Sequence, residues 1–112
     1  MLSAPNRLIK SADFSRVVRR GQRQGGPLLV THLLTDAFES QTQVGFVVSK
    51  AVGNAVTRNL VKRRLRHLMR LRVAALPTGS GVVVRALPSA ANASHTELSL
   101  ALDRCLNGLT SR

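Results

Sequence analysis

The chain has 112 residues, of which 44% are hydrophobic, so it can bury one core and is too short for two domains. Seventeen lysine and arginine residues stand against five acidic ones, and the net charge of +12 favours a polyanionic partner over an ordinary solvated surface. The single cysteine excludes an internal disulfide and a cysteine-based zinc site. No apolar run approaches the roughly 18 residues of a membrane span, and the start of the chain lacks the apolar core of a secretory signal, so we expect a cytoplasmic protein.

The N-terminal half predicts one helix followed by strands. Residues 1–10 are polar, and we expect them to be loose. A helix then begins at Ser11, with an acid in its first turn where the helix dipole favours an anion, and Gly21 ends it. We expect a short extra strand near residues 22–24.

Two apolar segments follow, at residues 28–35 and 44–49, and both predict strands. The polar residues 35–42 between them predict a hairpin loop. In the second strand three apolar side chains share one face by the period of two, namely Val44, Phe46 and Val48. Gly45 faces the other way, which indicates that something packs closely against that face.

The C-terminal half predicts helix, strand and helix. Asn54 is a good N-cap for a helix that we expect to run to about Leu76, where a proline stops it. Residues 82–87 form a nearly continuous apolar run, which is typical of a strand covered on both faces. Ser94 and Glu97 make a capping-box pattern at the start of the last helix.

The predicted order of elements is therefore αβββαβα within a single domain, residues 1–112. No repeat or low-complexity tract divides the chain. A mixed sheet of three strands, or four with the short extra strand, packed with helices is the natural closure of this order. We therefore place the chain in the α+β class, as an α/β sandwich.

The first long helix of the C-terminal half carries a concentrated positive charge. Seven basic residues lie between positions 58 and 72, and no acid occurs between positions 50 and 87. Four of them are spaced four residues apart and so form one row along the helix: Arg58, Lys62, Arg66 and Arg70. Arg63 lies beside this row, and the apolar side chains lie mainly on another face.

The absence of acids from this helix decides between two interpretations of the row. Like charges four residues apart destabilise a helix by a few tenths of a kcal/mol per pair, and a merely solvated helix normally intersperses glutamate to cancel this. We therefore favour a row that binds the phosphates of a nucleic acid over a solvated basic face. Such contacts fix position along the nucleic acid and do not read its bases.

The few aromatic and histidine side chains leave alternatives open. Phe14 is one of three aromatic residues, with Phe38 and Phe46, and either packs in the core or offers a platform for an unpaired base. His32 on the first predicted apolar strand is either a surface histidine or part of such a platform. Cys105 falls on the apolar stripe of the last helix, which indicates a core position.

The sequence offers no set of catalytic residues. The five acids are scattered, no carboxylates are paired, and no histidines have metal-ligand spacing. A nuclease that acts alone needs an acid–base pair or carboxylates that hold Mg²⁺. If the chain belongs to an enzyme, another component performs the chemistry.

The segment from Lys50 to Arg66 reads Lys-Ala-Val-Gly-Asn-Ala-Val-Thr-Arg-Asn-Leu-Val-Lys-Arg-Arg-Leu-Arg. It resembles the signature of the bacterial ribonuclease P protein component: a Gly-Asn-Ala-Val turn, then Arg-Asn, Lys-Arg and Arg at fixed spacing. The surroundings agree, with Asp-Phe on the first helix and Val-Gly-Phe-Val-Val-Ser-Lys before the turn. The resemblance covers about residues 6–109.

This resemblance implies a fold shared with some ribosomal proteins, a mixed four-stranded sheet with a left-handed βαβ crossover. It implies a catalytic RNA as partner, precursor tRNA as substrate and removal of the 5′ leader by hydrolysis, with Mg²⁺ held mainly by the RNA. The protein alone is expected to be inactive. A ribosomal or other structural rRNA-binding protein of the same fold remains the alternative, and a nuclease that acts alone is a second.

The resemblance also assigns residues to two surfaces. The signature residues would face the catalytic RNA, and Arg70 extends their row: Arg58, Asn59, Lys62, Arg63, Arg66 and Arg70. A cleft between the first helix, the sheet and the basic helix would take the single-stranded leader, and we assign to it Phe14, Val18, His32, Phe46 and Lys50. The chain departs from the family where Val18 replaces a frequent second aromatic and His32 a common tyrosine, which weakens the case for strong stacking of the leader.

Overall fold

The computed structural model describes residues 6–111, and its elements follow the predicted order. They are α1 (Ser11–Arg20), β1 (Gln22–Gly25), β2 (Leu29–Leu34), β3 (Gln43–Val47), α2 (Ala55–Arg70), β4 (Gly81–Ala86) and α3 (His95–Thr110). Short 3-10 helices at Val73–Ala75 and Pro88–Asn92 lead into and out of β4. The αβββαβα order and the α+β class are confirmed. No helix among these residues is long and apolar enough to cross a bilayer.

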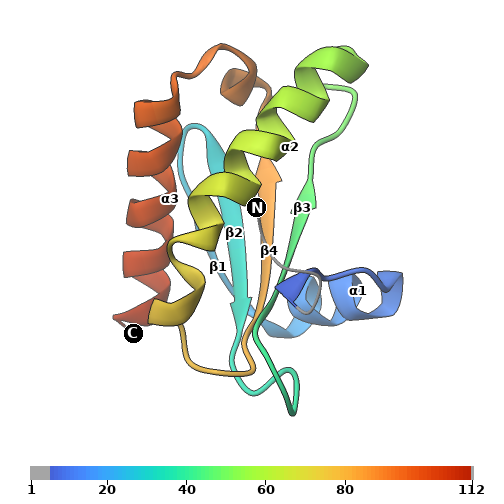
Figure 1. Ribbon diagram of the computed structural model, residues 1–112, viewed down its shortest axis with the longest axis vertical. Coiled ribbons are helices and arrows are strands. Elements are labelled where there is room, and N and C mark those ends of the chain that lie inside the picture. Colours follow the sequence, from blue (N-terminus) through green and yellow to red (C-terminus); the bar gives the residue numbers. More distant parts are fainter. Residues whose placement is uncertain (1–5, 112) are drawn as a thin grey trace.

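The strands of the described chain form one sheet in the order β1-β2-β4-β3. β2 pairs antiparallel with β1 and with β4, whereas β3 pairs parallel with β4. The predicted hairpin between residues 28–35 and 44–49 is therefore wrong, because β4 lies between the two strands (Figure 1). The physical reason is the valine run of β4, which is buried on both faces and needs a neighbour on each edge.

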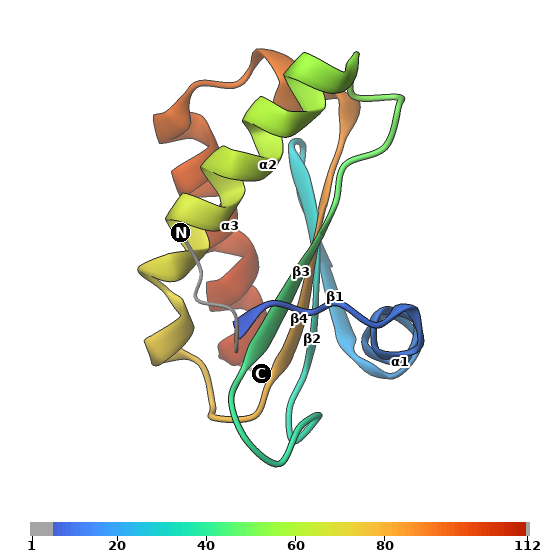
Figure 2. The ribbon, with the colours of Figure 1, turned by 45° about the vertical axis from the view of Figure 1, so that its right-hand side comes forward.

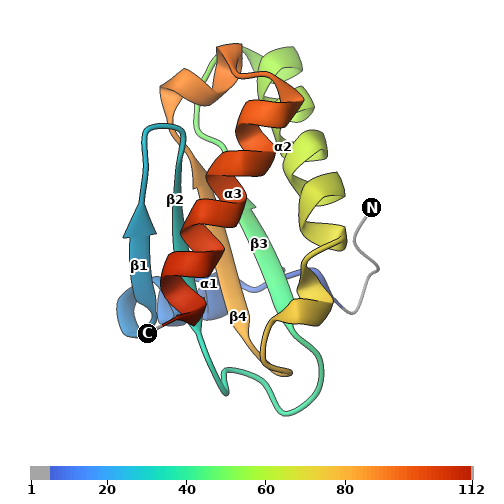
Figure 3. The same cartoon turned by 90° about the vertical axis from the view of Figure 1, so that its left-hand side faces the viewer.

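Helices cover the two faces of the sheet unequally. α2 and α3 lie together on one face, and α1 lies alone across one end of the other face (Figures 2 and 3). The larger core cluster fills the space under α2 and α3, and it includes Leu29, Val84 and Leu102. A smaller cluster under α1 joins Val17 to Val83. Much of the α1-side face of the sheet is therefore left for other groups.

The connection from β3 through α2 to β4 is left-handed. In Figure 1 both strands point upwards, α2 lies in front of the sheet, and the chain passes from β3 on the right to β4 on the left. About 98% of crossovers between parallel strands of one sheet are right-handed, so this is a marked departure. The crossover handedness implied by the family resemblance is confirmed.

The predicted helix caps are present at both long helices. The Asn54 side chain accepts a hydrogen bond from the backbone N–H of Thr57 at 2.9 Å. The Ser94 hydroxyl accepts one from the Glu97 N–H at 3.1 Å, and a Glu97 carboxylate oxygen accepts one from the Ser94 N–H at 2.9 Å. These bonds satisfy backbone donors that would otherwise lack partners in the first turn.

The end of α2 differs from the sequence prediction. The helix ends at Arg70 instead of continuing to about Leu76. The Arg72 guanidinium donates to the Leu68 carbonyl oxygen at 2.7 Å and to Asp103 of α3, also at 2.7 Å, which holds the chain at the end of the helix. The segment then turns and buries Leu76 in the main core.

The described part of the N-terminal segment lies along the edge of β3. Arg7 forms an isolated parallel bridge with Val44, and the Leu8 N–H donates to the Val44 carbonyl oxygen at 3.0 Å. Leu8 is only 6% exposed. The segment expected to be loose is thus attached at these residues, and its first five residues lie outside the described chain.

Gly45 allows α1 to approach the sheet closely, as the sequence predicts. A Cβ atom at Gly45 would overlap the Phe14 ring and come within 3.1 Å of Leu8. The absent side chain therefore makes the space in which Phe14 packs. This contact fixes the position of α1 and of the ring that it carries.

We predict that Gly45→Ala destabilises the protein by about 1–3 kcal/mol, because the new methyl group forces the Phe14 ring out of its position. For a domain of about 100 residues this lowers the thermal midpoint by several degrees. Gly26→Ala is the matched control, since a Cβ there meets nothing closer than 3.9 Å. Equal midpoints for the two variants would contradict the close packing.

Candidate nucleic-acid interface

The basic row, defined as Arg58, Lys62, Arg66 and Arg70 with Arg63 beside it, lies along the part of α2 that faces away from the core. The opposite side of the helix buries its apolar residues, Val61, Leu65, Leu68 and Met69. Arg63 and Arg70 are exposed, as is the neighbouring Asn59. The other three members of the row are partly buried: Arg58, Lys62 and Arg66. Long basic side chains commonly lay their methylene groups on the protein and keep the charge in water.

Two further arginines of this region serve the fold instead. Arg64 donates to the Ala93 carbonyl oxygen at 3.3 Å. Arg72 bonds Asp103 and donates to the Ser99 hydroxyl at 2.8 Å, and its hydrogen bond lowers the pKa of the Asp103 carboxyl. The four-residue spacing already left both outside the row, but it did not show which groups they contact.

The five residues of the basic row have no hydrogen-bonded or ion-paired side-chain partner within residues 6–111. The Nε atom of Arg58 is moreover buried without an acceptor. A buried donor without a partner costs about 1–3 kcal/mol. A bound anionic oxygen at this end of α2 would satisfy that donor.

The α1-side hollow is a shallow depression of about 600 Å³ between α1 and β3, lined by Phe14, Ser15, Val18, Arg19 and Val47. Phe14 is partly buried and Val18 is 42% exposed. His32 projects from β2 on this same side of the sheet, because its register neighbour Val83 belongs to the cluster under α1. The structure thus places three of the five predicted cleft residues on one face.

His32 is buried, at 8% exposure, and its Nδ1 atom has no hydrogen-bond partner among the described residues. Burial lowers the pKa of its imidazole below 6.5, and the nearby charges of Arg23 and Arg85 lower it further. Of the two alternatives for His32, a surface histidine is therefore wrong, because the residue is buried.

Sequence reasoning missed both arginines beside His32. Arg23 lies directly opposite it on β1, and Arg85 lies opposite Val30, one position along the same face. The alternation of side chains along a strand was the signal that could have found them, since Arg85 interrupts an apolar run at a position facing away from the main core.

Phe46 and Lys50 do not line the α1-side hollow. Phe46 packs against the main core on the opposite face of the sheet from Phe14, by the alternation of β3. Lys50 is exposed in the turn that precedes α2.

A second hollow, the β3-edge pocket, brings Phe14 and Phe46 to one cavity of about 300 Å³ across the free edge of β3. Its lining residues are Arg7, Leu8, Ile9, Phe14, Val44, Gly45, Phe46, Lys62 and Arg66. Two members of the basic row therefore stand at its wall. Phe14 lines this pocket as well as the α1-side hollow, so its ring forms a wall common to both.

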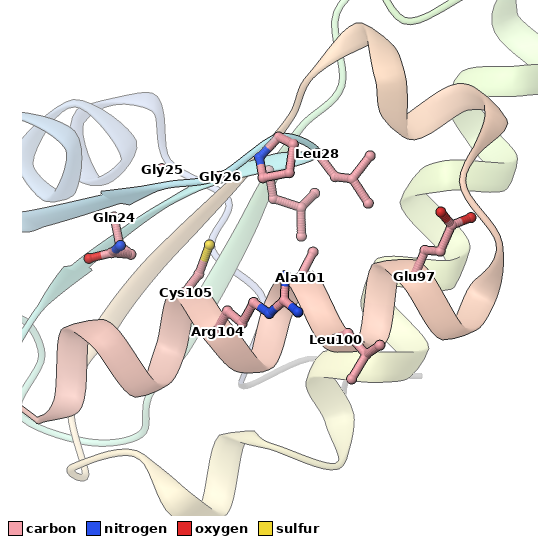
Figure 4. Close-up of a pocket in the computed structure, with 11 residues that line it drawn as sticks. Gln24, Gly25, Gly26, Leu28, Glu97, Leu100, Ala101, Arg104 and Cys105 are labelled. Carbon is pink, nitrogen blue, oxygen red and sulfur yellow. The ribbon is translucent and has the colours of Figure 1, made fainter.

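A cavity of about 520 Å³ lies elsewhere, between α3 and the turn that joins β1 to β2. Figure 4 shows Cys105 pointing from α3 into it, with Arg104 and Ala101 along the same helix. Burial raises the pKa of the Cys105 thiol, as suits the predicted core position. Charged side chains are few here, so this cavity does not resemble a phosphate-binding surface.

The acidic residues do not form a site for Mg²⁺. Within the described chain no three histidine, cysteine or acidic residues cluster as metal ligands would. Asp13 pairs with Arg16, Asp103 pairs with Arg72, and Glu97 caps α3. These three carboxylates thus have structural partners.

Comparison with known proteins shows the family of this chain. A protein-family model described as Ribonuclease P matches residues 2–110. The ribonuclease P protein component of Streptomyces avermitilis is 56% identical over 117 residues, covering 97% of this chain and 95% of that protein. The one from Nocardioides sp. is 58% identical over 108 residues, covering 95% and 92%.

Solved structures show the same fold. The chain matches the RNase P protein of Staphylococcus aureus with a TM-score of 0.82 at 25% identity, covering 91% of this chain and 93% of that one. The Thermotoga maritima RNase P protein, in complex with 1-(4-fluorophenyl)-2-thiourea, matches in fold with a TM-score of 0.78 at 23% identity, covering 95% and 99%. The chain therefore belongs to the bacterial ribonuclease P protein family and is a component of the ribonuclease P holoenzyme, an endoribonuclease that acts in the 5′ processing of precursor tRNA.

Proposed function

We propose that this protein binds the catalytic RNA of ribonuclease P through the basic row and Asn59 on α2, and holds the single-stranded 5′ leader of precursor tRNA against the α1 side of the sheet. The proposal is supported chiefly by the difference between two groups of basic residues on and just after α2. Arg64 and Arg72 are tied to protein acceptors, whereas the basic row has none in the described chain. Cations kept free in one row can neutralise the phosphates of a nucleic acid and fix its position.

The leader part of the proposal rests on the α1-side face. Phe14 and Val18 supply an apolar platform, and Arg19 lines the same hollow. Farther along the face, His32 lies between Arg23 and Arg85 with one ring nitrogen unpaired. An extended strand of unpaired nucleotides needs both kinds of contact, stacking for its bases and positive charge for its phosphates. Lys50 would add charge at the end of β3.

The chemistry of cleavage belongs to the RNA in this proposal. Mg²⁺ held mainly by the RNA would supply the activated water and the stabilisation of the leaving oxygen. The protein's own residues bind and orient the two RNAs in a cytoplasmic ribonucleoprotein. Holding the leader raises the affinity for precursor over mature tRNA, since the mature product has no leader to bind.

Reconstitution tests the proposal directly. Precursor tRNA is incubated at low Mg²⁺ concentration with the protein alone, with a bacterial ribonuclease P RNA alone, and with both. We expect cleavage at the mature 5′ end only with both components. Cleavage by the RNA-free protein would overturn the assignment of catalysis to the RNA.

We predict that Arg66→Ala weakens binding to the catalytic RNA and reduces its dependence on salt. Each phosphate contact contributes about 0.7–0.9 to the slope of log K against log salt concentration, so the slope should fall by about that amount. The free energy of unfolding should change by no more than about 0.5 kcal/mol, because the lost contact is with RNA. Binding is measured by fluorescence anisotropy over a salt series.

Arg104→Ala is the charge-matched control for this prediction. Arg104 is exposed on α3, away from the basic row, and its removal changes the net charge equally. A slope that falls equally for both variants would show that the protein binds RNA through overall charge and not through the row.

We predict that Val18→Phe increases the discrimination between precursor and mature tRNA. Val18 is 42% exposed beside Phe14, so a ring has room there without disturbing the core. A base stacked on an aromatic side chain contributes about 1–3 kcal/mol. The ratio of the two dissociation constants for the holoenzyme is the measurement, and Leu100→Phe on α3 is the control. An unchanged ratio would place the leader away from α1.

We predict that His32 makes the protein less stable as the pH falls below about 6.5. The pKa of His32 is lowered in the folded state, so the unfolded chain takes up the proton first as the pH falls through 6.5. Above that pH the imidazole is neutral in both states and contributes no pH dependence. Denaturant unfolding at about pH 7.5 and 5.5 should show a smaller loss of stability for His32→Gln than for wild type. An equal loss of stability in His32→Gln and wild type would contradict this prediction.

A further inference from the structure

We infer that the β3-edge pocket receives one unstacked nucleotide of the catalytic RNA and that the backbone of Phe46 hydrogen-bonds its base. This inference rests on the proposed function, because it assumes that the basic row binds that RNA. It adds a contact that reads a base to a surface otherwise made of phosphate contacts. The proposed occupant is an unpaired base of the catalytic RNA that lies along α2.

The size and walls of the pocket suit one base. Its volume of about 300 Å³ lies at the small end of the range for ligand pockets. Phe14 and Phe46 provide aromatic walls from opposite faces of β3, and Ile9, which is 78% exposed, provides an apolar rim. Planar apolar walls favour the flat face of an unstacked base.

The free edge of β3 supplies hydrogen-bonding groups at this point. The Val44 carbonyl oxygen accepts from the Leu8 N–H, whereas the Gln43 N–H donates to the Ser80 carbonyl oxygen on the other side. Because backbone groups alternate along a strand, the N–H and C=O of Phe46 point away from β4, as those of Val44 do.

Within residues 6–111, the N-terminal segment makes no hydrogen bond to the Phe46 backbone. Its bridge to β3 is confined to Arg7 and Val44, and no hydrogen bond joins Phe46 to Leu8 or Ile9. An adjacent donor and acceptor on one strand edge match the paired donor and acceptor on the hydrogen-bonding edge of a base. The pocket therefore offers polar recognition as well as apolar contact.

Charge complementarity identifies the occupant as a nucleotide of the catalytic RNA. Lys62 and Arg66 belong to the basic row and also line the pocket, so an RNA backbone that follows the row passes the pocket mouth. The phosphates on either side of an extruded nucleotide would lie against these two cations. Phe14 forms the wall toward the α1-side hollow, which keeps this pocket separate from the proposed leader surface.

Chemical probing of the RNA tests the inference. The catalytic RNA is treated with dimethyl sulfate and with a carbodiimide, which together report on the hydrogen-bonding edges of all four bases. This is done for RNA alone, with wild-type protein, and with Ile9→Trp, whose larger side chain fills the pocket. We expect one unpaired nucleotide to be protected by the wild type and reactive again with Ile9→Trp.

Affinity gives a second readout. Losing a stacked base should weaken binding of the catalytic RNA about tenfold, with the salt slope unchanged because no charge is removed. Leu100→Trp, at an exposed apolar position of α3, is the matched control and should bind as wild type. Equal thermal midpoints show that the fold is intact. Ile9→Ala, which only shortens the rim, should weaken binding less than the tryptophan variant.

Two results would overturn the inference. In the first, Ile9→Trp changes neither the reactivity of the RNA bases nor the affinity for the RNA. The other is a loss confined to the discrimination between precursor and mature tRNA, which would assign the pocket to the leader. A failure of the proposed function looks different, since Arg66→Ala would then leave the affinity and salt slope of the catalytic RNA unchanged.

Discussion

Burial of β4 on both faces is the constraint on which the rest of the structure depends. Val82, Val83 and Val84 are at most 1% exposed, so each face of the strand needs a covering layer and each edge a partner strand. α2 and α3 supply one layer, and α1 covers the other face at one end. Outside these layers lie the outer side of α2, the α1-side hollow and the edge of β3, which are the surfaces of the proposed function.

The positive charge of the protein is divided between residues that stabilise the fold and residues that are left unpaired on the surface. A net charge of +12 repels itself in a small domain and therefore works against folding. The fold neutralises only a part of it, through contacts such as that of Arg72 with Asp103, which also ends α2 and ties it to α3. The free cations stand together where a polyanion can neutralise them collectively. In the proposed complex the RNA thus removes a repulsion that the isolated protein must tolerate.

Local features of the fold were predictable from sequence, and non-local ones were not. The caps at Asn54 and Ser94 depend on residues within one helical turn. Gly45 indicates that another group packs closely against the strand, but the sequence does not identify that group as Phe14. The position of β4 between β2 and β3 depends on contacts between distant segments, so adjacency in sequence suggested a hairpin that does not form. The end of α2 likewise depends on Asp103, 31 residues beyond Arg72.

The candidate site shows the same limit. Helical spacing found the basic row because a row on one helix is a local pattern, yet it could not show that Arg64 has a protein acceptor 29 residues away. The cleft residues come from different elements, and strand alternation places Phe46 on the face opposite to Phe14. The two rings line one pocket around the edge of β3, where the described sheet has no further strand. An uncovered edge normally pairs with another strand, and the described residues of the N-terminal segment pair with this edge only at Val44. The rest of that edge is flanked by Lys62 and Arg66 of the basic row, and this charge suits a nucleotide better than an uncharged peptide strand, which would leave both cations unpaired.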